Sequence, residues 1–168
     1  VSPLYLEQFA KYIEKYPQVN VFHCRTAIID QQSNIIDLSE GWPEWESMLD
    51  NIYHRMKDRR IQFISDFVYR TSFLKNMNGF VKFPLAWNSD DVTAFEAATN
   101  NGIVHINEIL FYYRIRKRSM ARQLDDTKYK FLRKQLWLNH SLLYKRYFYS
   151  PLDSFEYLQL LNSREYKL

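Results

Sequence analysis

The chain has 168 residues, of which 46% are hydrophobic and 17% aromatic, so disorder is excluded and one compact domain with its own core is expected. The three glycines argue against a glycine-rich phosphate loop, and the single cysteine excludes an internal disulfide. No apolar run reaches the ~20 residues that span a bilayer. The net charge is +4, and the charges are distributed unevenly along the chain, because residues 114–168 carry 13 basic and 5 acidic side chains. Such a basic segment suits phosphates, an anionic membrane or nucleic acid.

The N-terminal segment predicts a helix. Ser2 is a favoured N-cap, Pro3 suits the first helical position, and Pro17 ends the pattern. Four apolar residues recur at helical spacing, which predicts one buried stripe. These residues are Leu6, Phe9, Ala10 and Ile13.

A β-hairpin is expected next. Residues 19–30 are rich in β-branched and aromatic side chains, and the QQSN segment at 31–34 has the composition of a turn. The apolar segment 35–38 then predicts the second strand. Cys24 lies within the first strand, and a lone cysteine fits a reducing cytoplasm.

The remaining pattern alternates between helices and strands. Helices are predicted from about Pro43 to Lys57, over a short segment that ends at Gly79, and from Ser89 to near Gly102. Strands are predicted over 59–70, 103–106 and 109–116, and the chain becomes helical from about Asp125. We therefore expect an α/β or α+β fold with a short mixed sheet flanked by helices, followed by a helical C-terminal extension over 123–168.

Asp90 and Asp91 at the start of a predicted helix have two interpretations. With Ser89 as N-cap, acidic residues in the first turn complement the helix dipole, and capping is the simpler interpretation. The second interpretation is catalysis, because a helix N-terminus can present a carboxylate rigidly to a cleft. When two neighbouring carboxylates interact, the pKa of one of them is raised, which suits a general base.

The loop before this pair favours a ligand. Gly79 permits close approach of the backbone, and Phe80 and Trp87 offer flat apolar faces of the kind that stack on sugars. The alternative is that these aromatic side chains belong to the core.

A cluster of basic residues follows the last predicted strand, with Arg114, Arg116 and Arg118 at alternate positions. A solvated face is the simple interpretation, and a phosphate site is the functional one, because guanidinium groups match phosphate oxygens. The four histidines lack the spacing of metal ligands.

Taken in order, these residues resemble the second half of inverting, family-two glycosyltransferases with the GT-A fold. The resemblance covers roughly residues 1–122. It rests on this ordered set: Arg70, Phe73, Asn78-Gly79-Phe80, Pro84, Asp90-Asp91, Gly102, Ile106, Tyr113-Arg114 and Ser119. It implies that residues 1–122 are the C-terminal half of the catalytic domain. Residues 123–168 lie beyond the resemblance, and we expect them to form a helical extension packed on this domain or docked on an anionic membrane.

The resemblance also implies roles for single residues. Asp91 takes the position of the general base that deprotonates the acceptor hydroxyl, and Asp90 replaces the usual Glu as its helper. Asn78, Gly79 and Phe80 match the acceptor-side loop. Arg114 and the basic residues after it, Arg116 and Arg118 among them, match the segment that closes over the nucleotide diphosphate.

Two departures concern the donor side of the reaction. The chain contains no Asp-x-Asp motif, and Arg116 stands where many relatives carry a metal-ligating His. The resemblance implies that this chain is the acceptor-side piece of a larger enzyme, inactive when isolated. It implies a nucleotide-sugar donor and a divalent cation, Mg²⁺ or Mn²⁺, whose ligands lie mostly outside this chain.

The expected acceptor is a saccharide or a lipid-linked molecule, with no nucleic-acid partner. The protein is expected in the cytoplasm, with the basic C-terminal region against the inner face of the membrane. Two other functions stay open from the residues alone. One is a nucleic-acid- or anion-binding module built on the basic cluster, and the other is a purely structural interaction domain.

Overall fold

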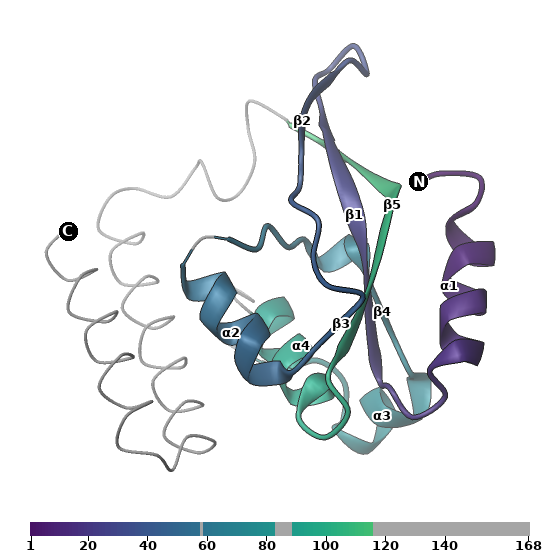
Figure 1. Ribbon diagram of the computed structural model, residues 1–168, viewed down its shortest axis with the longest axis vertical. Helices are drawn as coiled ribbons and strands as arrows, with labels where there is room; N and C mark the ends of the chain where they lie inside the picture. Colours follow the sequence, from purple (N-terminus) through teal and green to yellow (C-terminus); the bar gives the residue numbers. More distant parts are fainter. Residues whose placement is uncertain (58, 83–88, 116–168) are drawn as a thin grey trace, which may run out of the picture. The chain divides into compact units, whose positions relative to one another are not determined.

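The computed structural model of the chain describes residues 1–57, 59–82 and 89–115 (Figure 1). The chain divides into two compact units, Val1–Ser119 and Met120–Leu168. The predicted helical extension over 123–168 lies outside the described residues, as do Trp87, Arg116 and Arg118. In the described part, no helix is long and apolar enough to cross a membrane.

The first unit has a mixed α/β fold, which confirms the predicted class. Its sheet has the strand order β2-β1-β5-β3, and β4 pairs with β1 outside this path. The β1–β5 pair is parallel and the other pairs are antiparallel. The strands are β1 (Val21–Ile29), β2 (Ile35–Leu38), β3 (Trp45–Glu46), β4 (Phe67–Tyr69) and β5 (Ile103–Arg114).

Helices cover both faces of this sheet. In Figure 1, α1 lies on one side of β5 and β1, and α2 and α4 lie on the other. The side chains of β1 alternate accordingly. Phe22 and Cys24 pack with Phe9 of α1, whereas His23 stacks on Trp42 on the opposite face. The helices are α1 (Tyr5–Lys15), α2 (Met48–Met56), α3 (Thr71–Asn76) and α4 (Ser89–Ala98), with a 3₁₀ turn at Ile64–Asp66.

The predicted N-terminal helix is present, but it begins later and buries a different face. It starts at Tyr5, and the Ser2 hydroxyl accepts a hydrogen bond from the Leu4 backbone in the preceding turn. Of the predicted stripe, Phe9 is buried, while Leu6 is 79% exposed. Tyrosine side chains, and not Leu6 and Ala10, make up most of the rest of the buried face. The residues of α1 and its end that pack beside Phe9 are Tyr5, Tyr12, Ile13 and Tyr16.

The predicted hairpin is confirmed. Ala27 and Leu38 face each other across the antiparallel β1–β2 pair. The turn is held by Asp30, whose carboxylate accepts hydrogen bonds from the backbone of Gln32 and Asn34. These bonds, with that of the Asn34 side chain as the largest cause, lower the pKa of Asp30.

The helix predicted from Pro43 begins only at Met48. Trp45 and Glu46 instead form β3, which pairs with β5. Ser47 is the true N-cap, since its hydroxyl accepts a hydrogen bond from the Asp50 backbone N–H at 3.1 Å. Trp45 of β3 continues the helical spacing of the apolar residues in α2, so the sequence pattern places the start of the helix too early.

Two further predictions of strands are wrong in extent. Of the strand predicted over 59–70, only Phe67–Tyr69 pairs with β1 as a strand. The residues before it include the 3₁₀ turn at Ile64–Asp66, and the side chains of Arg60 and Gln62 make buried hydrogen bonds. The two strands predicted over 103–106 and 109–116 are one continuous strand, β5. Its register against β1 shifts on both sides of Arg25, which lets the polar segment at 107–108 remain within the strand.

Candidate functional site

The acidic pair lies at the start of α4, as predicted, but Ser89 does not cap the helix. Ser89 is the first helical residue, and its buried hydroxyl has no hydrogen-bond partner among the described residues. Asp91 is buried, with 3% of its surface exposed, whereas Asp90 is partly exposed. The two carboxylates therefore occupy different environments although they are neighbours in sequence.

Asp91 is bound by an arginine of α2. The Nε atom of Arg55 lies 3.2 Å from Asp91 Oδ1 and 3.3 Å from Oδ2, and Nη2 lies 3.1 Å from Oδ2. Both carboxylate oxygens are thus held by one guanidinium group. Such charge-assisted, two-point contacts are stronger and more directional than single hydrogen bonds.

Asp90 has a raised pKa. Burial is the main cause, and the neighbouring charge of Asp91 adds to it, while backbone hydrogen bonds and Arg55 act in the opposite direction. One carboxylate of the pair is therefore ion-paired with an arginine, and the other takes up a proton more readily than an ordinary aspartate.

Tyr69 of β4 joins this site, and the sequence analysis did not identify it. Its buried hydroxyl has no hydrogen-bond partner in the described part of the chain. Burial, followed by the charges of Asp90 and Asp91, raises the pKa of the phenol, which keeps it protonated as a donor. Its position directly before Arg70, one of the residues of the resemblance, is a signal that could have identified it.

The predicted acceptor loop lies beside these groups. Asn78 and Gly79 have left-handed backbone angles, with φ of 59° and 93°. Phe80 is 39% exposed, and its ring meets that of Tyr69 edge-on at 5.5 Å between centroids. A hydrogen bond of 3.0 Å from the Val81 backbone to Thr93 Oγ1 ties the loop to α4. The fold therefore brings Asn78, Gly79 and Phe80 together with the helix that carries the acidic pair.

Arg114 is engaged at the far end of the sheet. Its Nη1 donates to the carbonyls of Asp30 and Gln31 at 2.6 and 3.1 Å, and Nη2 donates to the Ser33 hydroxyl at 2.9 Å. The guanidinium holds the β1–β2 turn here. The contact of Arg114 with a diphosphate stays a prediction. The same holds for Arg116 and Arg118, which lie outside the described residues.

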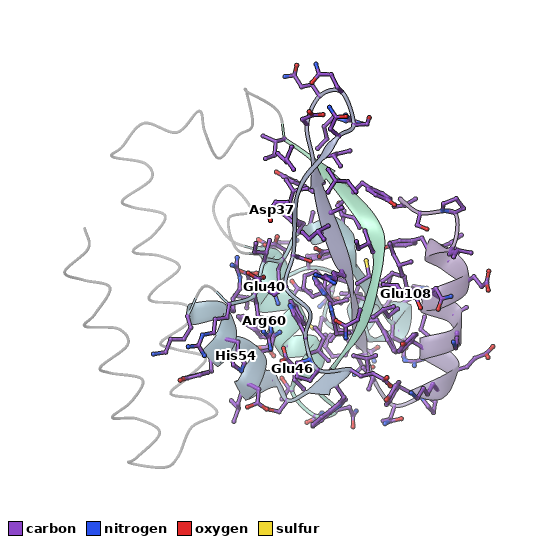
Figure 2. The ribbon with its side chains drawn as sticks, turned by 45° about the horizontal axis from the view of Figure 1, so that its top comes forward. Asp37, Glu40, Glu46, His54, Arg60 and Glu108 are labelled. Atoms are coloured by element: carbon purple, nitrogen blue, oxygen red, sulfur yellow. The ribbon has the colours of Figure 1, made fainter. Side chains whose placement is uncertain are left out.

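A buried polar network supports α2 behind the site. Arg60 and Glu46, both labelled in Figure 2, form a buried ion pair with an Nη2–Oε2 distance of 2.8 Å. Glu46 also accepts a hydrogen bond from Asn51 of α2 at 2.6 Å. Because α2 carries Arg55, this network fixes the position of the helix whose arginine binds Asp91.

Two buried histidines form the other part of this interior. The Nδ1 atoms of His23 and His105 are 2.8 Å apart, and the Trp42 ring stacks on both imidazoles. Burial, then the neighbouring His23 and Arg60, lowers the pKa of His105 to about 2, so this ring is neutral at any physiological pH. Asp66 Oδ1 lies 3.2 Å from His23 Nε2, close enough for an ionic contact but out of line for a hydrogen bond.

Metal ligation is not apparent in the described ranges. No group of three or more His, Cys, Asp or Glu side chains converges there. The acidic pair is associated with an arginine, and the two buried histidines are associated with each other and Trp42. The described residues therefore do not fit the divalent cation that the resemblance implies, whose ligands would lie elsewhere.

The fold and the site define a mixed α/β domain with a carboxylate pair at a helix N-terminus. Comparison with protein-family models gives no match, and comparison with curated proteins gives no significant match.

Proposed function

We propose that the chain is the acceptor-side part of a nucleotide-sugar-dependent glycosyltransferase that inverts the anomeric centre. One observation carries this proposal. The loop with Asn78, Gly79 and Phe80 is tied to the helix that bears Asp90 and Asp91, and the Tyr69 ring, which meets Phe80, lies near enough to both carboxylates for their charges to raise the pKa of its phenol. An apolar ring beside carboxylates is suited to a sugar, whose C–H face stacks while its hydroxyls donate hydrogen bonds.

In the proposed reaction, Asp91 is the general base. Its carboxylate accepts the proton of an acceptor hydroxyl while that oxygen forms a bond to the anomeric carbon of the donor. The bond from this carbon to the diphosphate breaks on the opposite face, and the electron pair leaves with the diphosphate. Attack from the face opposite the leaving group inverts the configuration.

The other site residues assist this step. Asp90, partly exposed at the helix N-terminus, hydrogen-bonds the acceptor, and Phe80 with Trp87 supplies the stacking surface. Arg114, Arg116 and Arg118 stabilise the charge that develops on the diphosphate. Mg²⁺ or Mn²⁺ would be held by residues outside the described ranges, and no step above depends on it.

The acceptor is a saccharide or a lipid-linked sugar, and the reaction takes place in the cytoplasm. The basic residues of 114–168 would draw the enzyme to the inner face of an anionic membrane, where a lipid-linked acceptor is presented.

The test uses the protein as encoded, including any residues before Val1. A panel of labelled nucleotide sugars is supplied, and transfer of the labelled sugar to an acceptor is measured. Asp91→Asn is expected to lower turnover by ~10²-fold or more while donor binding is retained. Asp37→Asn, an exposed change of the same chemistry on β2, is the matched control and is expected to leave turnover unchanged. Salt-sensitive binding of oligonucleotides without any sugar transfer would instead favour an anion-binding module.

A further inference from the structure

Arg55 is the residue that fixes the orientation of the Asp91 carboxylate. It contacts both oxygens from one side, with three donor–acceptor distances between 3.1 and 3.3 Å. A planar guanidinium sets the rotation of a carboxylate as well as its position, which the single ammonium group of a lysine does not do. With 4% of its side chain exposed, Asp91 has little room for another orientation.

Arg55 is itself held from behind. Its Nη1 donates to the backbone carbonyl of Arg60 at 3.1 Å. Arg60 in turn is fixed by the ion pair with Glu46 and by the face of Trp42, 5.0 Å from its guanidinium carbon. The contact with Asp91 is therefore continuous with the buried interior, and is not an isolated pair of surface charges.

Within the described ranges, side chains of three elements lie near Asp91. Arg55 of α2 carries the positive charge, Asp90 of α4 carries a negative charge, and Tyr69 of β4 contributes a neutral phenol. If Arg55 is replaced by an uncharged residue, Asp91 remains beside Asp90 without the positive charge of the guanidinium. The Asp91 carboxylate would then lose the two-point contact that sets its rotation, and its orientation would be free to change.

We propose that Arg55 is a positioning residue, which holds the Asp91 carboxylate in the orientation that accepts the proton of the acceptor hydroxyl. This inference rests on the proposed function, since it assigns Arg55 to the base of that reaction. Arg55 acts through Asp91 and takes no part in bond making itself.

The test is a pH profile of sugar transfer by the protein as encoded, with Arg55→Gln and Arg55→Lys. Arg55→Gln is expected to lower kcat by up to about 100-fold with little change in KM for the donor, because a misplaced base slows chemistry more than binding. The acid limb of the profile is expected to move to higher pH, since a carboxylate that loses its cation is protonated more easily. Arg55→Lys keeps the charge and should restore the acid limb but only part of kcat.

Arg59→Gln is the matched control, because Arg59 is an exposed arginine four residues along the chain. It should change neither kcat nor the acid limb. Thermal unfolding of each variant separates a loss of fold from a loss of positioning, and Arg55→Lys supplies a variant that retains the ion pair.

The outcomes separate the two proposals. If Asp91→Asn abolishes transfer but Arg55→Gln leaves both kcat and the acid limb unchanged, the positioning role is wrong and the base assignment stands. If Asp91→Asn retains full turnover, the base assignment fails, and the role of Arg55 fails with it.

Discussion

At the scale of single residues, the site distinguishes two adjacent carboxylates by their surroundings. Asp91 is buried and is held by Arg55, while Asp90 is partly exposed and has a raised pKa. Burial and then the neighbouring charge of Asp91 make the ionised form of Asp90 less favourable. The pair therefore has one carboxylate that is held by an arginine and one whose pKa is raised.

The raised pKa of Asp90 predicts how stability depends on pH. A carboxyl group whose pKa is higher in the folded protein favours the folded state when protonated, and this contribution is lost as pH rises through the folded pKa. Asp90→Asn removes the charge. The variant is therefore expected to gain stability over the wild type at neutral pH, and to lose that advantage below the ordinary pKa of aspartate.

Urea unfolding of Asp90→Asn and the wild type at a series of pH values would measure this difference. An advantage that is the same at pH 3 and pH 7 would show that Asp90 does not carry the pH dependence.

The Tyr69 hydroxyl, which has no hydrogen-bond partner among the residues that the structure describes, predicts different effects on stability and on acceptor binding. A buried hydroxyl without a partner costs free energy, so Tyr69→Phe is expected to keep the free energy of unfolding or raise it by up to about 1 kcal/mol. If the hydroxyl donates to the acceptor, the same variant raises KM for the acceptor. Chemical denaturation and acceptor titration measure the two effects, and a clear loss of stability would show that the hydroxyl has a partner in the fold.

At the scale of elements, the site depends on how α2 and α4 are held at the sheet. The chain turns from α4 into β5 at Gly102, whose φ is 70°. A Cβ atom there would lie 2.5 Å from the Glu46 carbonyl and 2.6 Å from the Trp45 ring of β3. The close approach of these segments thus requires glycine, both for the backbone angle and for space.

Gly102→Ala is expected to lower the free energy of unfolding by about 2 kcal/mol or more, because the left-handed angle and the backbone contact are both unfavourable for alanine. Urea denaturation measures the change. Gly79→Ala is the comparison, since Gly79 also has positive φ but its added Cβ would meet no atom within 4 Å. Equal losses at the two positions would show that the contact with β3 contributes nothing.

At the scale of the whole molecule, local signals predicted most of the described fold. The turn at 31–34, the glycines that end α3 and α4, and the alternation of helices and strands are all visible along the chain, and they gave the α/β class. The start of α2 could not be placed in this way, because the pairing of Trp45 and Glu46 with β5 joins segments more than fifty residues apart. Sequence patterns of a single chain do not show such pairings.

The candidate site also contains residues that the sequence predicted and residues that it did not. Asp90, Asp91, Gly79 and Phe80 were predicted from sequence order and lie together in the structure. The residues that hold them, Arg55 and Tyr69 above all, come from other elements and have no motif of their own. Their roles arise from burial and distance, which only the folded chain provides.

The central claim, inverting transfer with Asp91 as the base, is tested most directly by the product of a single reaction. Proton NMR of the new glycosidic bond, made by the protein as encoded from the nucleotide sugar that it uses, gives the anomeric configuration. We predict a configuration opposite to that of the donor in the wild-type product, and product formation lower by ~10²-fold or more with Asp91→Asn. Retention of the donor configuration, or normal product formation by Asp91→Asn, would contradict the claim.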